Sequence, residues 1–269
     1  AINRFAGADV NLFIQLKKHY YDLSEYTLKS NYRSRKGIVD AGNLLMGGNP
    51  IEHAKPTELA AAKIQSTDID SVWLEFRKDE KYKYDRLSDQ KFLWRKDASG
   101  RRKSDSGEDK ARLVKAIYSV CKTMVSKAGK IAVLFRTNMY KGSRIGEIRK
   151  KVLHCFTEGF TRAQLENMTS RLEFSTAHSS KGKEYDTVLV VSPHYGSYPC
   201  IHPDAQLLRF FGESAKQGLE DEMRLFYVAI TRAERRLIFL KEASKNSESP
   251  FLSDFDHLVD DLKLSQLCS

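Results

Sequence analysis

Apolar residues follow two regular patterns along this chain. Short apolar runs predict β-strands over residues 72–76, 131–135, 172–176, 187–192 and 236–241. Apolar residues at spacings of three and four predict helices over residues 9–20, 35–46, 108–127, 142–155, 161–168, 219–233 and 250–262, with Asp9 and Ser34 as N-caps of the first two. Because apolar strands alternate with amphipathic helices, we expect an α/β fold, with a parallel sheet covered by helices on both faces.

Two segments interrupt this alternation. Residues 77–110 are densely charged, with Ser, Asp and Gly toward their end, which is typical of a solvated and partly disordered excursion. Residues 193–218 contain Pro193, Pro199 and Pro203, so we expect an irregular connection there. These two segments are therefore expected to lie outside the alternating strands and helices.

The chain is strongly basic. Its 269 residues carry a formal net charge of +10, which favours an anionic partner, with nucleic acid as the leading candidate. The four cysteines are widely spaced and include no Cys-x-x-Cys pair, which indicates free thiols in a reducing compartment such as the cytoplasm, and no zinc site. No apolar stretch has the length of a transmembrane helix, so we expect no membrane partner.

Arg232 has no obvious partner in the sequence. On a helix over 219–233 it falls nearly opposite the apolar stripe, and the residues one turn earlier are Val228 and Ala229, so no carboxylate answers it from that turn. A guanidinium near apolar surface needs an anion. The alternative is a solvated surface arginine, or one paired with an acidic residue that is distant in sequence.

Polar residues follow two of the predicted strands. Arg136, Thr137 and Asn138 follow the strand over 131–135, and residues 177–182 follow the strand over 172–176. Ligands of parallel α/β folds bind at the carboxyl ends of strands, which makes both segments candidates for binding. Arg33, just before a predicted helix, adds a cation near backbone amides that favour anions.

The stretch "STAHSSKGKEYD" (175–186) combines small polar residues with a lysine and a glycine. Successive backbone amides in such a turn can form an anion-binding nest, and Thr176, His178 and Ser179 could add hydrogen bonds to phosphate oxygens. The alternative is a capped turn with a solvated lysine, in which His178 is a hydrogen-bonded structural residue.

Several hydrolase motifs are missing from the sequence. It contains no G-x-x-x-x-G-K-[ST] phosphate loop, no G-x-S-x-G and no H-E-x-x-H. No acidic pair follows a strand as a convincing Mg²⁺ site. The sequence therefore predicts anion-binding arginines without the residues that would activate ATP alone.

Five stretches, taken in order, resemble the C-terminal motor motifs of UvrD/Rep-type superfamily 1 DNA helicases. These are "AINRFAGAD" (1–9), "LKSNYRSRKGIVDAGN" (28–43), "IAVLFRTN" (131–138), "FSTAHSSKGKEYDTVLVV" (174–191) and "DEMRLFYVAITRAERRL" (221–237). The short connection over 139–171, where large members insert a whole domain, and "SPF" after the last strand are most similar to the helicase IV branch.

The resemblance implies a nucleotide role for four residues. Arg33 and Arg232 match arginines that reach the ATP γ-phosphate and stabilise the transition state of phosphoryl transfer, so they are the expected catalytic residues. Tyr32 matches a residue that stacks on adenine, and Glu184 matches an acidic residue close to the nucleotide. The alternative for Tyr32 is a tyrosine of the core.

The resemblance also implies contacts to single-stranded DNA. Thr176 and His178 match residues that contact the strand backbone, and Arg136 and Asn138 are further candidates. Phe5 matches an aromatic residue on which a base stacks. Its alternative is a phenylalanine of the core.

Three residues depart from the family pattern. Asn3 stands where many members have tyrosine and Ala6 where many have arginine, which weakens the stacking role of Phe5. Lys183 replaces a common leucine.

The resemblance implies a RecA-like domain over 26–269, preceded over 1–25 by the tail of a first RecA-like domain. The expected protein is an ATP-dependent 3′–5′ helicase or translocase, with the phosphate loop and the Mg²⁺ ligands in an absent N-terminal domain. The chain alone is then expected to be inactive and to hold no metal. The rivals are a non-catalytic nucleic-acid-binding or interaction module, and a nuclease-linked helicase subunit, which would need a carboxylate cluster.

Overall fold

The computed structural model describes residues 15–16, 18–20, 22–24, 30–47, 60–61, 69–74, 83–87, 90–94, 107–125, 129–140, 143–157, 160–191, 197–200, 215–242, 249–252 and 260–263. Asn3, Phe5, Ala6 and most of the helix predicted over 9–20 lie outside these residues. In the part of that helix that is described, the amide of Tyr20 donates to the carbonyl of Leu16 over 2.9 Å, as in a helical turn.

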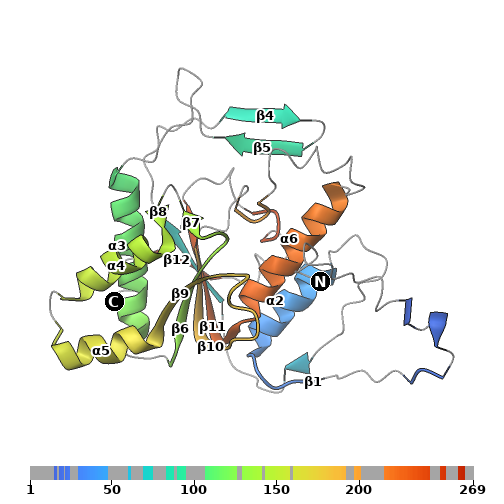
Figure 1. Cartoon of the computed structure of the whole chain (residues 1–269), viewed down its shortest axis with the longest axis horizontal. Coiled ribbons are helices and arrows are strands. Elements are labelled where there is room, and N and C mark those ends of the chain that lie inside the picture. Colours follow the sequence, from blue (N-terminus) through green and yellow to red (C-terminus); the bar gives the residue numbers. More distant parts are fainter. Residues whose placement is uncertain are drawn as a thin grey trace.

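A six-stranded sheet forms the centre of the fold, with the strand order β12-β3-β11-β10-β6-β9 and every neighbouring pair parallel (Figure 1). The strands are β3 (Ile69–Leu74), β6 (Ile131–Phe135), β9 (Leu172–Thr176), β10 (Tyr185–Val191), β11 (Ala233–Glu242) and β12 (Asp260–Lys263). All five residues of β6 are buried. The predicted α/β fold with a parallel sheet is confirmed.

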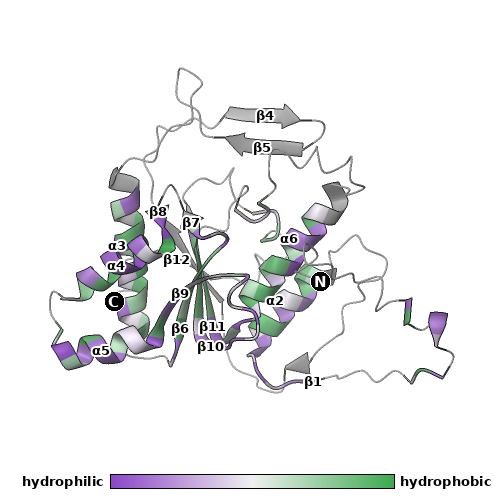
Figure 2. Ribbon diagram, in the orientation of Figure 1, coloured by the Kyte–Doolittle hydropathy of each residue, from purple (hydrophilic) through white to green (hydrophobic). Residues whose placement is uncertain are grey.

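Helices cover both faces of the sheet. On one side lie α3 (Gly107–Val125), α4 (Ile145–Thr157) and α5 (Arg162–Arg171), and on the other lie α2 (Lys36–Gly47) and α6 (Ala215–Ile230) (Figure 1). Along β10, Leu189 and Val191 pack in the core on the side of α3, α4 and α5. Val188 and Val190 pack in the core on the side of α2 and α6. This alternation follows from the two-residue period of a strand, and it explains why the strand reads as a continuous apolar run. Figure 2 shows that the helices beside the sheet carry both apolar and hydrophilic residues, as amphipathic helices do.

Helices α2 and α6 pack closely because a glycine lies between them. A Cβ on Gly42 of α2 would approach the ring of Tyr227 on α6 to 3.0 Å, tighter than side chains normally tolerate. These two helices flank the segments that carry Arg33 and Arg232. No described helix is both long and apolar enough to cross a bilayer.

The segment over 77–110 differs from its prediction as a solvated loop. It contains an antiparallel hairpin of β4 (Lys83–Leu87) and β5 (Gln90–Trp94), and its last residues begin α3. Aromatic residues such as Phe92 and Trp94 are interleaved with the charges, and such residues favour strands. The high charge density of the segment led to the prediction of a loop, although its aromatic residues favour strands.

The helix predicted over 250–262 is wrong. Residues 249–252 form a turn, in which the amide of Leu252 donates to the carbonyl of Ser249 over 3.0 Å. Strand β12 then pairs with β3 at the edge of the sheet. A short segment with mixed apolar spacing takes the conformation that its sheet neighbour offers, which local periodicity cannot reveal.

Two short pairings complete the described structure. Strand β1 (Ser30–Asn31) pairs in parallel with β2 (Ala60–Ala61), and β7 (Met139–Tyr140) pairs antiparallel with β8 (Ser143–Arg144). The first pairing lies immediately before Arg33.

Candidate functional site

The predicted site residues form two groups at opposite ends of the parallel sheet. Arg33, Glu184 and Arg232 lie where β10 and β11 begin, and we name them the amino-end cluster. A second set lies where β6 and β9 end, and we name it the carboxyl-end cluster: Arg136, Asn138, Thr176 and His178. Strand β10 has seven residues, so the two ends are separated by about 20 Å. Phe5 lies outside the described residues.

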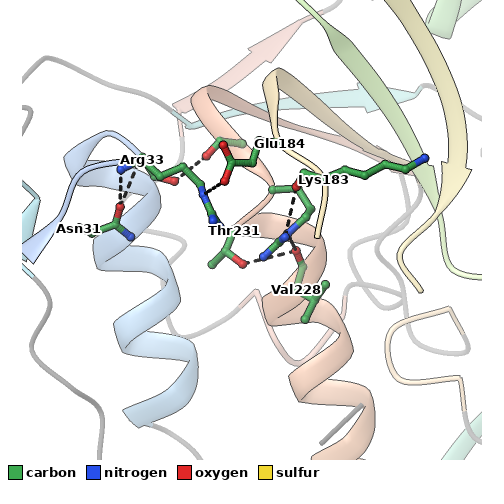
Figure 3. A network of polar contacts seen from close by, with 9 residues as sticks. Asn31, Arg33, Lys183, Glu184, Val228 and Thr231 are labelled. Atoms are coloured by element: carbon green, nitrogen blue, oxygen red, sulfur yellow. Dashed lines mark hydrogen bonds and ion pairs between the residues drawn. The ribbon is translucent and has the colours of Figure 1, made fainter. Parts of the chain in front are cut away.

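Within the amino-end cluster, Arg33 and Glu184 form an ion pair. The Nε of Arg33 lies 2.6 Å from Oε1 of Glu184, and the two side chains retain 40% and 45% of their accessible surface (Figure 3). A pair this exposed contributes little to stability, because water screens the charges and both side chains lose freedom. Separating Arg33 from Glu184 therefore costs little free energy.

Arg232 is anchored by carbonyl oxygens. Its Nε donates to the carbonyl of Val228 over 3.1 Å, and its Nη1 donates to the carbonyl of Lys183 over 3.2 Å. Val228 lies in the last turn of α6, where carbonyls lack partners within the helix. In the turn that precedes Arg232, the contact to its guanidinium is thus made by a backbone carbonyl.

The electrostatics of the amino-end cluster favour an added anion. Burial lowers the pKa of Arg232, the charge of Arg33 lowers it further, and the charge of Glu184 opposes both effects. Two guanidinium groups and one carboxylate leave an excess positive charge at this place. A phosphate group would relieve the repulsion between the two arginines.

The backbone around Arg33 is fixed by side chains on both sides. Oδ1 of Asn31 accepts hydrogen bonds from the amides of Arg33 and Ser34, over 2.9 and 3.1 Å (Figure 3). The hydroxyl of Ser34 donates to the carbonyl of Ala233 over 2.7 Å. Sequence reasoning missed Asn31, although an asparagine two residues before a turn position is typical of an Asx-turn.

The prediction that Ser34 caps helix α2 is wrong. The helix begins at Lys36, and the carbonyl of Arg35 accepts the first helical hydrogen bond, from the amide of Val39 over 3.1 Å. Ser34 is 2% exposed, and its hydroxyl donates a hydrogen bond to the carbonyl of Ala233. A tertiary contact has replaced the local cap.

Tyr32 lies beside Arg33 with 74% of its surface exposed. The alternative reading of Tyr32 as a core tyrosine is therefore wrong. A large aromatic ring that is exposed beside Arg33 presents a flat surface on which another ring can stack.

In the carboxyl-end cluster, Arg136 is already paired. Its Nε donates to Oε2 of Glu222 over 2.8 Å, and its Nη2 donates to Oε1 of the same carboxylate. The two side chains are only 16% and 12% exposed. Burial lowers the pKa of Arg136, but the hydrogen bond and charge of Glu222 outweigh it, so the pKa is raised overall. The amide of Cys200 also donates to Glu222, over 2.8 Å.

The turn after β9 directs its amides inward. Oγ1 of Thr176, a buried residue, accepts from the amide of Ser179 over 3.1 Å. The amides of Ser180, Lys181 and Lys183 donate to carbonyls within the same turn. The predicted nest of free amides is therefore wrong for these residues, and the capped turn holds. Gly182 has a φ of 79°, which glycine adopts without strain.

His178 and Asn138 are the more accessible members of the carboxyl-end cluster. Burial lowers the pKa of His178 below 6.5, as does the charge of Arg136, while Glu222 opposes them. The imidazole is therefore mostly neutral at pH 7. Asn138 is exposed, and its carbonyl accepts from the amide of Ile145 at the start of α4, over 3.1 Å.

The described residues do not offer a metal site. Across the described ranges no three His, Cys, Asp or Glu side chains form a group that could hold a metal ion. The amino-end cluster fits the phosphates of a nucleotide by its charge, whereas nothing in the described part of the chain fits Mg²⁺.

Comparison with known proteins gives one family match. Residues 158–244 match the family described as the UvrD-like helicase C-terminal domain. The matched region contains Glu184 and Arg232, together with Thr176 and His178, whereas Arg33 lies outside it.

Similar proteins carry helicase names. The chain is 25% identical over 247 residues to a probable DNA helicase of Mycoplasma pneumoniae, an alignment that covers 90% of this chain and 36% of the relative. It is 33% identical over 91 residues to a probable DNA helicase II homolog of Mycoplasma genitalium, covering 34% of this chain and 12% of that relative. The chain thus spans well under half of these relatives. A solved C-terminal domain of a possible DNA helicase from Lactobacillus plantarum shares 13% identity, with a TM-score of 0.44 and coverage of 86% of this chain and 98% of that one.

Proposed function

We propose, from the match of residues 158–244 to the UvrD-like helicase C-terminal domain family, that the chain is the C-terminal motor domain of an ATP-dependent DNA helicase. In this proposal it works with an N-terminal RecA-like domain of the same protein, which binds ATP. The chain contributes two arginines to the ATP and a surface to single-stranded DNA.

The convergence of Arg33 and Arg232 carries the proposal. They come from distant parts of the sequence, yet Arg33 pairs with Glu184, and Arg232 contacts the carbonyl of the adjoining Lys183. When the two domains close, the γ-phosphate of ATP takes the place of Glu184 opposite Arg33. Positive charge then stabilises the transition state of phosphoryl transfer. Hydrolysis breaks the bond between the β- and γ-phosphates. The inorganic phosphate then dissociates, Glu184 pairs again with Arg33, and the domains separate.

The adenine and the metal are assigned to different domains. The exposed ring of Tyr32 offers a stacking surface for adenine beside Arg33. Mg²⁺, which neutralises charge on the phosphates when it is bound, is assigned to acidic residues of the N-terminal domain. The described residues contain no cluster for it.

Single-stranded DNA is assigned to the opposite end of the sheet. The accessible Asn138 and His178 contact the strand in this proposal, and a neutral imidazole does so by hydrogen bonding. Thr176 and Arg136 hold this surface from beneath, because their polar groups are engaged within the chain. The DNA surface and the nucleotide surface are thus joined by the strands of one rigid sheet.

The direction of movement and the branch of the family are also proposals. Translocation from 3′ to 5′ follows from the resemblance of the motor motifs. The described residues of the connection over 139–171 form β7, β8, α4 and α5, and the shortness of this connection supports similarity to the helicase IV branch.

The test is kinetic and uses a protein in which this chain is joined to its nucleotide-binding domain. We expect Arg33→Ala and Arg232→Ala each to lower kcat for ATP by about 10²- to 10⁴-fold, as is typical of arginine fingers, with little change in affinity for single-stranded DNA. Arg235→Ala is the matched control, because Arg235 is also in this region but is 59% exposed and paired with Asp186.

Three results would count against the proposal. An unchanged kcat in both arginine variants would favour a non-catalytic nucleic-acid-binding module. An equal loss of DNA affinity would mean that the arginines are assigned to the wrong ligand. ATP turnover by this chain alone, abolished by Arg232→Ala, would contradict the need for a second domain.

A further inference from the structure

The position of Arg33 depends on a turn closed by Asn31. Oδ1 of Asn31 accepts from the amides of Arg33 and Ser34, over 2.9 and 3.1 Å. One side-chain oxygen therefore fixes two consecutive peptide groups, the first of which belongs to Arg33 itself. This arrangement restricts the backbone on both sides of the Arg33 side chain.

The same turn is tied to the residues that follow Arg232. The buried hydroxyl of Ser34 donates to the carbonyl of Ala233 over 2.7 Å, across 199 positions of sequence. The amide of Arg35 donates to the carbonyl of Glu234 over 2.9 Å. Since Ala233 directly follows Arg232, these hydrogen bonds fix the backbone next to Arg33 relative to the backbone next to Arg232.

The side chain of Arg33 is held less firmly than its backbone. Its side chain is 40% exposed and forms an ion pair with Glu184, whose side chain is 45% exposed. A pair of this kind is weak in water and is the contact that an incoming phosphate replaces. Once Glu184 is displaced, the backbone turn decides where the guanidinium can reach.

We propose that Asn31 is a positioning residue for Arg33, which sets its distance from Arg232 and so makes the two arginines converge on one phosphate. This role rests on the proposed function. Without the acceptor oxygen of Asn31, two amides lose their partner and the turn relaxes. A displacement of about 1 Å at a reacting group can cost up to about 10²-fold in rate.

A purely structural role for Asn31 is the competing explanation. Strand β1 contains Asn31, so its loss could simply weaken β1 and the start of α2. The two explanations differ in one respect. A residue that acts through Arg33 has no effect on kcat once Arg33 is gone, whereas a structural residue keeps its effect.

A double-mutant cycle on kcat for ATP separates them, in the protein that joins this chain to its nucleotide-binding domain. The variants are Asn31→Ala, Asn31→Asp, Arg33→Ala and the double variant Asn31→Ala with Arg33→Ala. We expect Asn31→Ala to lower kcat about 10- to 100-fold with KM for ATP and affinity for single-stranded DNA nearly unchanged. Asn31→Asp keeps an acceptor for both amides and retains most of the rate.

The decisive result is the double variant, which is expected to match Arg33→Ala alone. If Asn31→Ala costs as much in the Arg33→Ala background as in the unmodified protein, Asn31 is structural and the inference fails while the proposed function stands. If Arg33→Ala itself leaves kcat unchanged, the proposed function fails and the inference with it. If Asn31→Ala does not fold, Asn31→Asp provides the test. The inference expects this variant to retain most of the rate. It is overturned if Asn31→Asp, at unchanged thermal stability, loses as much rate as Arg33→Ala.

Discussion

Two arginines of this chain, Arg33 and Arg136, each pair with a glutamate, and the two pairs differ in almost every physical respect. Arg136 and Glu222 meet through two parallel hydrogen bonds in a site that is less than one-fifth exposed. Arg33 and Glu184 meet through a contact at 2.6 Å with both side chains about 40% exposed or more. The ion pair of Arg136 and Glu222 is mostly buried and held by two hydrogen bonds. The ion pair of Arg33 and Glu184 is solvated and therefore weak.

The difference follows from what else surrounds each guanidinium. Glu222 also accepts a hydrogen bond from the amide of Cys200, so its carboxylate has partners on two sides. Replacing it would leave the mostly buried guanidinium of Arg136 without its counter-charge. Near Arg33 lies a second cation, Arg232, whose pKa is lowered by burial and by the charge of Arg33. A lone carboxylate does not neutralise two arginines. An anion-binding site is therefore identified by the excess of charge around an arginine, and the presence of an arginine alone does not indicate one.

Removing the glutamate from each pair is expected to show the largest contrast. Glu222→Gln leaves Arg136 without its counter-charge in a mostly buried site, so we expect a loss of about 3 kcal/mol in the free energy of unfolding. Glu184→Gln breaks a solvated pair, and a loss below about 1 kcal/mol is expected. Chemical denaturation of this chain measures both values. Equal losses would remove the distinction between a closed and an exchangeable pair.

A smaller effect is expected from pH at the carboxyl-end cluster. Because burial and Arg136 lower the pKa of His178 in the folded chain below its ordinary 6.5, the unfolded chain binds a proton more readily. The stability contributed by neutral His178 is present above pH 6.5 and is lost as pH falls from there through the folded pKa. Denaturation between pH 7.5 and about 5 should therefore show a smaller decline for His178→Gln than for the unmodified chain. Identical pH profiles would mean that the imidazole is not perturbed.

Much of the fold could be predicted because its strands are buried on both faces. The run "IAVLF" gives β6 its bounds without error, since five consecutive apolar residues fit a strand between two helix layers. Helix α3 follows from its apolar spacing in the same way. Strand β12 was predicted as helix, because an edge strand is defined by its pairing with a neighbour, here β3, which the local sequence does not encode.

The candidate site was predictable in its residues and less so in their surroundings. The motif resemblance selected Arg33, Glu184 and Arg232, and the structure places the three together. It did not reveal that Arg136 is engaged by Glu222, which lies 86 positions away in sequence. The amides after Thr176 were expected to face a ligand, yet they turn inward. The first difference arises from a hydrogen bond between distant segments, and the second from hydrogen bonds within the turn itself. Motif spacing along the chain reveals neither.

The most direct test compares the arginine side chains in one measurement. In a protein that joins this chain to the nucleotide-binding domain proposed above, the Nε–Hε signals of Arg33, Arg136 and Arg232 are followed by nuclear magnetic resonance while a non-hydrolysable ATP analogue and Mg²⁺ are added. We expect the signals of Arg33 and Arg232 to shift and to exchange more slowly with water, while that of Arg136 stays in place. A shift of Arg136 with unchanged signals from Arg33 and Arg232 would contradict the assignment of the amino-end cluster to the nucleotide.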